Sequence, residues 1–245
     1  MKDNFSTQST AYSKYRPHYP DELIDYIMTF VNKTNQALDV ATGNGQMASH
    51  LSKYFKKVYA TDISKNQLNN AVKHENIIYS LNGAEKTNFN DEQFDLITVA
   101  QAIHWFDFER FYMEVYRTLK NDGVFAVIGY GLFSSNSHSD KIVAKLYEDV
   151  LGSYWHPERR YLDENYTTIP FPFNEFPTNK FTNQLTWSFE QLEGYLDSWS
   201  ATQHYKDKHG SNPIDYIRAE LRESWENNDK QVTIPLLLRI GTKKI

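Results

Sequence analysis

The sequence predicts an α/β protein built on a doubly wound, mostly parallel sheet of seven strands, with a helical cap inserted among the C-terminal strands. Three observations lead to this fold class. Between Asp21 and Gly131, short apolar runs of strand length alternate with segments whose apolar residues recur at helical intervals. A glycine-rich loop follows the first run, and the rhythm changes after Gly131. Such alternation is typical of parallel strands joined by helices that cover both faces of the sheet.

The elements of the first half follow one another in a regular order. The first helix is predicted after Pro20, over residues 21–31. Strands are then predicted over 37–42, 58–64, 77–82, 94–103 and 123–131. Helices are predicted between them over 45–55, 65–73 and 108–120, and the last of these stops at the turn sequence Asn121-Asp122-Gly123.

The second half predicts the cap and two further strands. Helices are predicted over 139–152, 188–205 and 212–225, and a proline-containing stretch over 166–181 is predicted to be irregular. Strands are predicted over 180–189 and 231–243, with Pro235 indicating an edge strand or a bulge. We expect residues 1–135 to form the core and residues 136–245 to form the cap together with the last two strands of the same sheet.

Composition excludes several classes of function. The net charge of −5 gives no basic surface for nucleic acid. The chain has no cysteine, which removes disulfides, thiolate metal sites and cysteine nucleophiles, and no other set of metal ligands is predicted. No apolar run approaches the roughly 18 residues of a membrane span, and the first residues lack the apolar segment of a secretory signal. We therefore expect a cytoplasmic protein that does not enter a membrane.

The stretch ALDVATGNGQMASHL contains the pattern Gly43-x-Gly45-x-x-Ala48, which fits a dinucleotide-binding loop. Its glycines permit positive φ and let a ligand approach the backbone, and the helix that follows directs free N–H groups at that ligand. In a nicotinamide enzyme these groups would meet a pyrophosphate. Asp39, however, stands just ahead of the loop, where it would repel a pyrophosphate and favour an ammonium group.

Asp62 ends the second predicted strand, where a carboxylate can accept both hydroxyls of a ribose. A ligand that carries ribose, ammonium and carboxylate but no phosphate is S-adenosylmethionine. The two acids therefore favour this cofactor over a nicotinamide dinucleotide.

Five stretches resemble, in order, the motifs of the class I, Rossmann-like methyltransferases: LDVATGNGQMASHL, VYATDIS, NGAEKTNF, FDLITVAQAIHWFD and VYRTLKNDGVFAV. The opening AYSKYRPHYPDEL resembles that of the type 11, trans-aconitate methyltransferase-like branch. The first motif of the family is commonly acid-x-Gly-x-Gly-x-Gly, and this chain departs from it at Ala41 and Met47. The resemblance covers about residues 12–131 and is specific for fold and cofactor rather than for the methyl acceptor.

The loop, the two acids and the resemblance together give a set of candidate cofactor-binding residues. Ala84 and Glu85 are included because their stretch resembles the family segment that flanks the adenine. Arg16 is included because it could pair with the methionine carboxylate or with an anionic substrate. The full set is Tyr15, Arg16, Asp39, Ala41, Gly43, Gly45, Asp62, Ile63, Ala84, Glu85, Gln101 and Ala102.

Other candidates belong to the side of the methyl acceptor. Ligands of doubly wound sheets lie beyond the carboxyl ends of the strands. His104 follows the fourth strand and Tyr130 ends the fifth, so both are candidate catalytic residues, although a structural role is equally consistent with the sequence. Tyr12, Trp105, Arg159 and Arg160 are candidate substrate-binding residues; the alternatives are packing for the tryptophan and a solvated charge run for the arginine pair.

The sequence thus predicts an S-adenosylmethionine-dependent methyltransferase that acts on a small molecule, either a carboxylic acid or another oxygen nucleophile. Methyl transfer needs an acceptor lone pair in line with the S–CH3 bond, and a base only if the acceptor must lose a proton. Two alternatives stay open at this point. One is a nicotinamide-dependent oxidoreductase, and the other is a module that binds the cofactor without catalysis.

Overall fold

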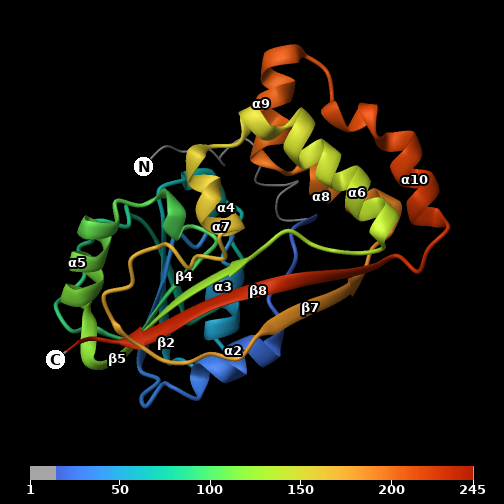
Figure 1. Cartoon of the computed structure of the whole chain (residues 1–245). Coiled ribbons are helices and arrows are strands. Elements are labelled where there is room, and N and C mark those ends of the chain that lie inside the picture. The colour runs from blue at the N-terminus through green and yellow to red at the C-terminus, as the bar shows by residue number, and fades with distance from the viewer. Residues whose placement is uncertain (1–14, 245) are drawn as a thin grey trace.

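The computed structural model describes residues 15–244, and their central feature is a sheet with the strand order β3-β2-β1-β4-β5-β8-β6, in which β7 also pairs with β8 (Figure 1). The strands are β1 (Gln36–Val40), β2 (Lys57–Asp62), β3 (Ile77–Leu81), β4 (Phe94–Ala100), β5 (Leu119–Tyr130), β6 (Asn174–Glu175), β7 (Phe181–Thr186) and β8 (Gln231–Thr242). The first five are parallel and β8 is antiparallel to β5. Because β6 and β7 pair with different parts of the same edge of β8, the sheet is seven strands wide, as the sequence predicts.

Helices cover both faces of this sheet. They are α2 (Asp21–Met28), α3 (Gln46–Leu51), α4 (Lys65–Asn69) and α5 (Phe108–Thr118). Side chains of β5 show how the two faces divide: Val124, Ala126 and Ile128 pack in the cluster that contains α2 and α3, whereas Phe125 and Val127 pack in the cluster that contains α5. Alternate residues of a strand point to opposite faces, so an almost wholly apolar strand such as β5 must be buried on both.

The cap consists of helices that lie together beyond one end of the sheet (Figure 1). Its elements are α6 (Ser137–Lys145), the π-helical turn η2 (Leu146–Val150), the 3₁₀ turns η3 (Gly152–Tyr154), η4 (Pro157–Arg159) and η5 (Pro213–Tyr216), and the helices α7 (Arg160–Asp163), α8 (Phe189–Asp197), α9 (Ser200–His209) and α10 (Arg218–Glu226). They enter the chain in two parts, one before β6 and one between β7 and β8. The prediction of a helical cap among the C-terminal strands is therefore confirmed.

One predicted helix of the cap is in fact two. The sequence predicts a continuous helix over residues 188–205, but Trp199 is extended, with φ −68° and ψ 137°, and separates α8 from α9. The Ser198 hydroxyl donates to the carbonyl of Tyr195, and the Thr202 hydroxyl donates to the carbonyl of Leu196. These side chains satisfy carbonyls at the end of α8, while the break buries the Trp199 ring in the cap core.

The expectation that Pro235 marks an edge or a bulge is confirmed locally, because at Pro235 the ladder pairs β8 with β7 only, and on the side of β5 the next bridge, Ser134–Thr233, is offset by one residue from the pair Tyr130–Leu236. The carbonyl of Pro235 accepts the N–H of Gly131 at 3.0 Å. Since N and C=O of one residue point to the same side of a strand, the missing N–H of Pro235 also faces the β5 side. The β5–β8 ladder ends at the pair Tyr130–Leu236, so the proline lies just past it and removes no ladder bond.

Asp95 of β4 ties three parallel strands together at the amino edge of the sheet. Its Oδ2 accepts the N–H groups of Asn35 and Gln36 at 2.9 Å each, at the start of β1. Its Oδ1 accepts Lys120 Nζ of β5 at 2.6 Å, and the Asp95 side chain is 3% exposed. A buried carboxylate with three charge-assisted hydrogen bonds is stable in place, whereas its removal leaves three donors without their acceptor.

We expect Asp95→Ala to lower the free energy of unfolding by about 3 kcal/mol, because it leaves a partly buried lysine and two strand-end N–H groups unpaired. Urea denaturation followed by circular dichroism measures this change. Asp122→Ala is the matched control: Asp122 pairs with Lys33 on the surface, so its loss should leave the midpoint nearly unchanged. Equal midpoints for the two variants would contradict the anchoring role of Asp95.

Candidate active site

The glycine loop between β1 and α3 contains three residues at positive φ: Ala41 at 53°, Gly43 at 56° and Gly45 at 82°. A Cβ added to Gly43 would meet no atom within 4 Å, whereas one added to Gly45 would lie 2.2 Å from Tyr79 Oη. Gly45 is thus required by conformation and by packing, and Gly43 leaves open space beside the backbone. Ala41 adopts a left-handed conformation at a cost of roughly 1 kcal/mol relative to the ordinary right-handed one.

Asp62, at the end of β2, is fixed by the backbone of this loop and of the next one. Its Oδ2 accepts the N–H of Gly43 at 2.9 Å, and its Oδ1 accepts the N–H of Ser64 at 2.8 Å. The residue is 8% exposed. A carboxylate oxygen has two lone pairs and can accept a ligand hydroxyl in addition to a backbone N–H.

Asp39 lies beneath the loop and is 1% exposed. Its oxygens accept the hydroxyls of Thr42 at 2.5 Å and Thr98 at 2.9 Å. Burial disfavours the charged carboxylate and raises the pKa of Asp39 to about 6, although these hydrogen bonds act in the opposite direction. A cation placed next to Asp39 would stabilise the charged form and lower this pKa.

Three side chains meet at the carboxyl ends of β4 and β5. Arg16 donates from Nη1 to Tyr130 Oη at 3.2 Å and from Nη2 to the carbonyl of Ser198 in the cap at 2.8 Å. Its guanidinium also lies 5.4 Å from the centre of the Tyr195 ring. Gln101, with a positive φ of 55°, donates from Nε2 to the carbonyl of Tyr130 at 3.0 Å. Arg16 therefore joins the N-terminal segment to the sheet and to the cap.

These groups line a cleft with about 560 Å³ of empty space. Its walls include Arg16, Asp39, Ala41, Gly43, Gln101 and Tyr130. Asp62 adjoins the cleft through its bond to Gly43. The cleft thus brings together an acid, an arginine and the open side of the glycine loop.

A second cavity, with about 510 Å³ of empty space, lies between the core and the cap. The core contributes Gln101, His104 and Trp105, and the cap contributes Trp155, His156 and Arg159. Arg16 and Gln101 line both cavities, so the two adjoin each other at these residues.

Arg159 supplies positive charge to the second cavity. Its Nε donates to Tyr147 Oη at 2.9 Å and lies 3.4 Å from a carboxylate oxygen of Asp163. Its guanidinium lies 4.9 Å from the centre of the Trp155 ring, and the side chain is 19% exposed. Within residues 15–244 no hydrogen bond engages either Nη atom of Arg159. The outer end of this guanidinium is consequently available to an anion.

His104 lies on the 3₁₀ turn η1 (Ile103–Trp105) and is 5% exposed. Its Nδ1 is 2.9 Å from Tyr166 Oη. Burial, assisted by the charge of Arg159, lowers the pKa of His104 to about 3. The imidazole is therefore neutral at neutral pH, and it is too weakly basic to be an efficient proton acceptor there.

Comparisons with known proteins agree with this geometry. Residues 38–127 match the family model of a methyltransferase domain. A protein of Dictyostelium discoideum described as a methyltransferase is 34% identical over 231 residues, which cover 93% of this chain and 88% of that protein.

The chain belongs to the class I, Rossmann-like methyltransferases. A Saccharomyces cerevisiae relative described as an S-adenosylmethionine-dependent methyltransferase is 26% identical over 98% of this chain and 94% of its own length. The solved structure of an Anaeromyxobacter dehalogenans protein described as a type II methyltransferase has a TM-score of 0.85 and 33% identity, covering 93% of this chain and 98% of that chain. A Haemonchus contortus phosphoethanolamine N-methyltransferase solved with S-adenosylmethionine shares the fold alone, with a TM-score of 0.52, 19% identity and coverage of 98% and 57%.

The cofactor of this methyltransferase is S-adenosylmethionine, and the first cleft fits its chemical groups. Asp62 could accept the ribose hydroxyls, Asp39 could face the ammonium group, and Arg16 could pair with the carboxylate. An acid in the wall opposes a pyrophosphate. Membership of the family sets aside both the nicotinamide-dependent oxidoreductase and the module without catalysis.

Some of the residues selected from the sequence lie away from both cavities. Ala84 and Ala102 are buried, Glu85 accepts the N–H of Asp107 at 3.4 Å, and Ile63 is not among the residues that line either cavity. Tyr15 packs against Gly194 of α8. Arg160 is exposed and donates to Tyr161 Oη at 3.1 Å, so only Arg159 of the arginine pair reaches the second cavity. Tyr12 lies outside the described residues.

Other residues of the cavities were missed by the sequence analysis. Thr42, Asn44 and Gln46 line the first cleft and belong to the glycine loop itself, so their position in the motif could have identified them. Trp155 lines the second cavity and precedes the arginine pair. Tyr166 carries no signal, because it follows a short cap helix and reaches His104 only through the tertiary fold.

We expect Asp62→Asn to weaken S-adenosylmethionine binding roughly 10- to 100-fold, because the amide replaces an anionic acceptor for the ribose hydroxyls. Calorimetric titration with S-adenosylmethionine and S-adenosylhomocysteine measures the loss. Asp21→Asn, on the surface of α2, is the control and should bind like the unmodified protein. Unchanged affinity in Asp62→Asn would exclude Asp62 from the cofactor site.

The pKa of Asp39 gives the cofactor affinity a pH dependence. In the free enzyme Asp39 is protonated below about pH 6, and the cofactor ammonium favours the ionised form. We expect a constant affinity near pH 7–8 and a decline of up to about tenfold per unit as the pH falls below 6. Asp39→Asn should bind more weakly at pH 8 and show no such decline; a decline that persists in this variant would mean that another group is responsible.

Within residues 15–244, no helix combines the length and the apolar composition that a membrane crossing requires.

Proposed function

We propose that this methyltransferase transfers the methyl group of S-adenosylmethionine to a small anionic acceptor, a carboxylic acid or another oxygen anion, held in the second cavity. The observation that carries the proposal is the charge of that cavity. Arg159 lines it with a guanidinium whose hydrogen bond, within residues 15–244, uses only Nε, Arg16 stands at its junction with the cofactor cleft, and among the same residues none that lines it is acidic. Two guanidinium groups beside aromatic walls form a good environment for a carboxylate on a compact organic body.

The chemistry follows from the adjacency of the two cavities. A carboxylate oxygen attacks the methyl carbon from the side opposite the sulfur, the O–CH3 bond forms, and the S–CH3 bond breaks with its electron pair passing to sulfur. The products are a methyl ester and S-adenosylhomocysteine. The positive charge of the sulfonium and the negative charge of the acceptor cancel, so positioning and exclusion of water can supply much of the rate.

The neutral state of His104 also favours an acceptor that is already ionised. A hydroxyl acceptor would need a base, and a histidine whose pKa is lowered to about 3 is a poor one at neutral pH. A carboxylate is ionised without help. The role left for His104 and for Tyr130 is to orient the reactants at the junction of the cavities.

The size of the acceptor is limited by the cap. The second cavity is bounded by the core on one side and by η4, α7 and α9 on the other, so an acceptor must fit between them. We assign residues 1–135 to the cofactor-binding core and residues 136–245 to the cap and the closing strands. We also propose that the reaction takes place in the cytoplasm, because a chain without cysteines forms no disulfides and so does not depend on an oxidising compartment.

A screen of small carboxylic acids tests the proposal. The assay measures S-adenosylhomocysteine release and identifies the methyl ester by mass spectrometry, with the matching alcohols and amines as comparison acceptors. We expect turnover with at least one class of carboxylic acid and, at saturating S-adenosylmethionine, no dependence on pH above the pKa of that acid. Methylation of alcohols or amines alone would overturn the assignment of the acceptor.

With an acceptor identified, Arg159→Met should raise its KM roughly 10- to 100-fold, because a charge-assisted hydrogen bond to the acceptor is lost. The dissociation constant of S-adenosylmethionine should stay the same. Arg160→Met is the matched control, since Arg160 is the neighbouring, exposed arginine and should have no effect on either constant. Equal KM values for the two variants would remove Arg159 from the acceptor site.

A further inference from the structure

Tyr166 is held in an unusual conformation behind the second cavity. It is fully buried and has a positive φ of 59°, as does the preceding Asn165, with 53°. A bulky residue in the left-handed region is strained, so the surrounding structure must impose this conformation. The Tyr166 ring lies against Gly129 of β5, where an added Cβ would come 2.6 Å from the ring. Because residue 129 is glycine, no side chain of β5 occupies the space that the Tyr166 ring fills.

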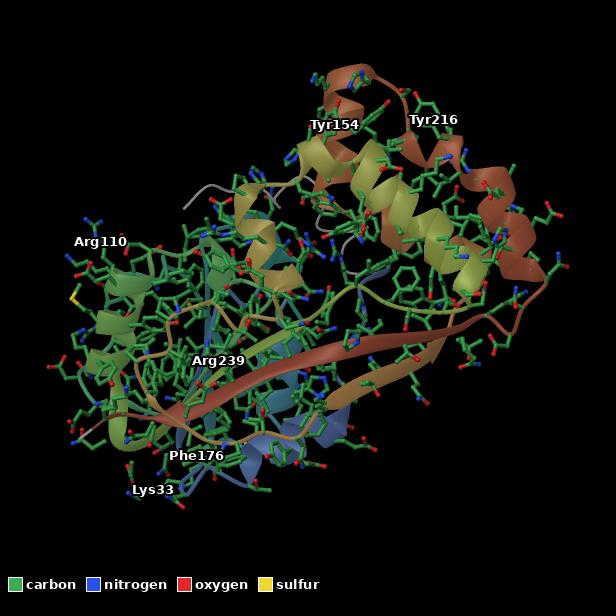
Figure 2. The ribbon with its side chains drawn as sticks, viewed as in Figure 1. Lys33, Arg110, Tyr154, Phe176, Tyr216 and Arg239 are labelled. Atoms are coloured by element: carbon green, nitrogen blue, oxygen red, sulfur yellow. The ribbon has the colours of Figure 1, made fainter. Side chains whose placement is uncertain are left out.

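The segment that carries Tyr166 is clamped to β8 by Arg239, which Figure 2 labels on that strand. Arg239 Nη1 donates to the carbonyls of Tyr166 at 3.1 Å and Ile169 at 2.5 Å. Its Nε and Nη2 donate to the two carboxylate oxygens of Glu175 at 2.7 Å each. All three guanidinium nitrogens are thus used to fix residues 166–175, the segment whose backbone carries the Tyr166 ring.

That position places Tyr166 Oη 2.9 Å from His104 Nδ1. A phenol is a stronger acid than a neutral imidazole N–H, and an imidazole nitrogen is a stronger base than a phenol oxygen, so the proton of this bond belongs to Tyr166. With Nδ1 accepting, the ring proton of neutral His104 must be on Nε2. Within residues 15–244 no hydrogen bond occupies Nε2, and it is not among the buried atoms without a partner, so it opens to the cavity that His104 lines.

We propose that Tyr166 is a positioning residue: its hydroxyl fixes His104 as the Nε2–H tautomer and makes His104 a hydrogen-bond donor to the methyl acceptor. The inference rests on the proposed function in that the acceptor is an oxygen anion. The second cavity then presents donors from both of its sides, His104 from the core and Arg159 from the cap. A neutral hydroxyl finds no proton acceptor in His104, and a carboxylate meets two donors that direct its second oxygen away from the methyl group.

The first test needs no acceptor. Long-range ¹H–¹⁵N NMR of the ¹⁵N-labelled protein reports which ring nitrogen of each histidine carries the proton, and His104→Gln assigns the His104 signals by their loss. We expect the Nε2–H tautomer in the unmodified protein and a mixture of tautomers in Tyr166→Phe, which keeps the buried ring and removes only the hydroxyl. An Nδ1–H tautomer in the unmodified protein would overturn the proposal outright.

The second test uses the acceptor identified by the screen. Tyr166→Phe should raise the acceptor KM about tenfold with an unchanged dissociation constant for S-adenosylmethionine, since one orienting hydrogen bond is lost. Tyr161→Phe is the matched control: within residues 15–244 its hydroxyl, in the same part of the cap, bonds only the exposed Arg160, and Tyr161 is not among the residues that line either cavity. An acceptor KM in Tyr166→Phe equal to that of the control would contradict the positioning role.

His104 variants separate a donor from a base. Gln can donate from its amide near the position of Nε2–H but cannot take up a proton, so His104→Gln should retain several-fold more activity than His104→Ala. Equal loss in both variants would indicate a base and overturn the proposal. If no carboxylic acid is a substrate, the proposed function fails, while the tautomer in the unmodified protein and in Tyr166→Phe still decides the role of Tyr166.

Discussion

The parallel order of β3, β2, β1, β4 and β5 is the constraint on which the rest of the molecule depends. Parallel strands bring all their carboxyl ends to one edge, so Asp39, Asp62, Gln101 and Tyr130 meet although nearly a hundred residues separate the first from the last. The chain must leave each strand sharply at this edge, and left-handed residues at Ala41 and Gln101 provide the turns. The backbone strain at these two residues is tolerated because the sheet that carries them is buried on both faces.

The opposite edge and the last strand keep this arrangement rigid. Asp95 bonds the start of β1 and the lysine of β5, so three strands share one buried carboxylate. At the other side, β8 returns antiparallel to β5 and carries Pro235 where no ladder donor is needed. Because β8 also carries Arg239, the same strand that closes the sheet fixes the segment from which Tyr166 reaches His104.

The two cavities differ in charge, and the difference matches the two reactants. The cofactor cleft has a buried acid whose pKa is raised to about 6 and an arginine at its rim, so it suits a ligand with both charges. The second cavity has Arg16 and Arg159 and, among the residues that the structure describes, no acid in its walls, so it suits an anion. Arg16 lines both cavities and is hydrogen-bonded both to the sheet and to the cap. A change in the position of the cap would therefore also move the positive charge that lies between the two reactants.

The sequence by itself determined the seven-stranded sheet, the glycine loop and the two acids, because strand periodicity and short motifs are local properties of the chain. It also pointed to Arg159, but it could not separate Arg159 from Arg160, since adjacent residues of a helical turn differ only in the direction that packing gives them. The break at Trp199 and the contact of Tyr166 with His104 were decided by the tertiary structure alone. Each depends on which distant surface is buried against the residue, and that is a property of the assembled fold rather than of any stretch of sequence.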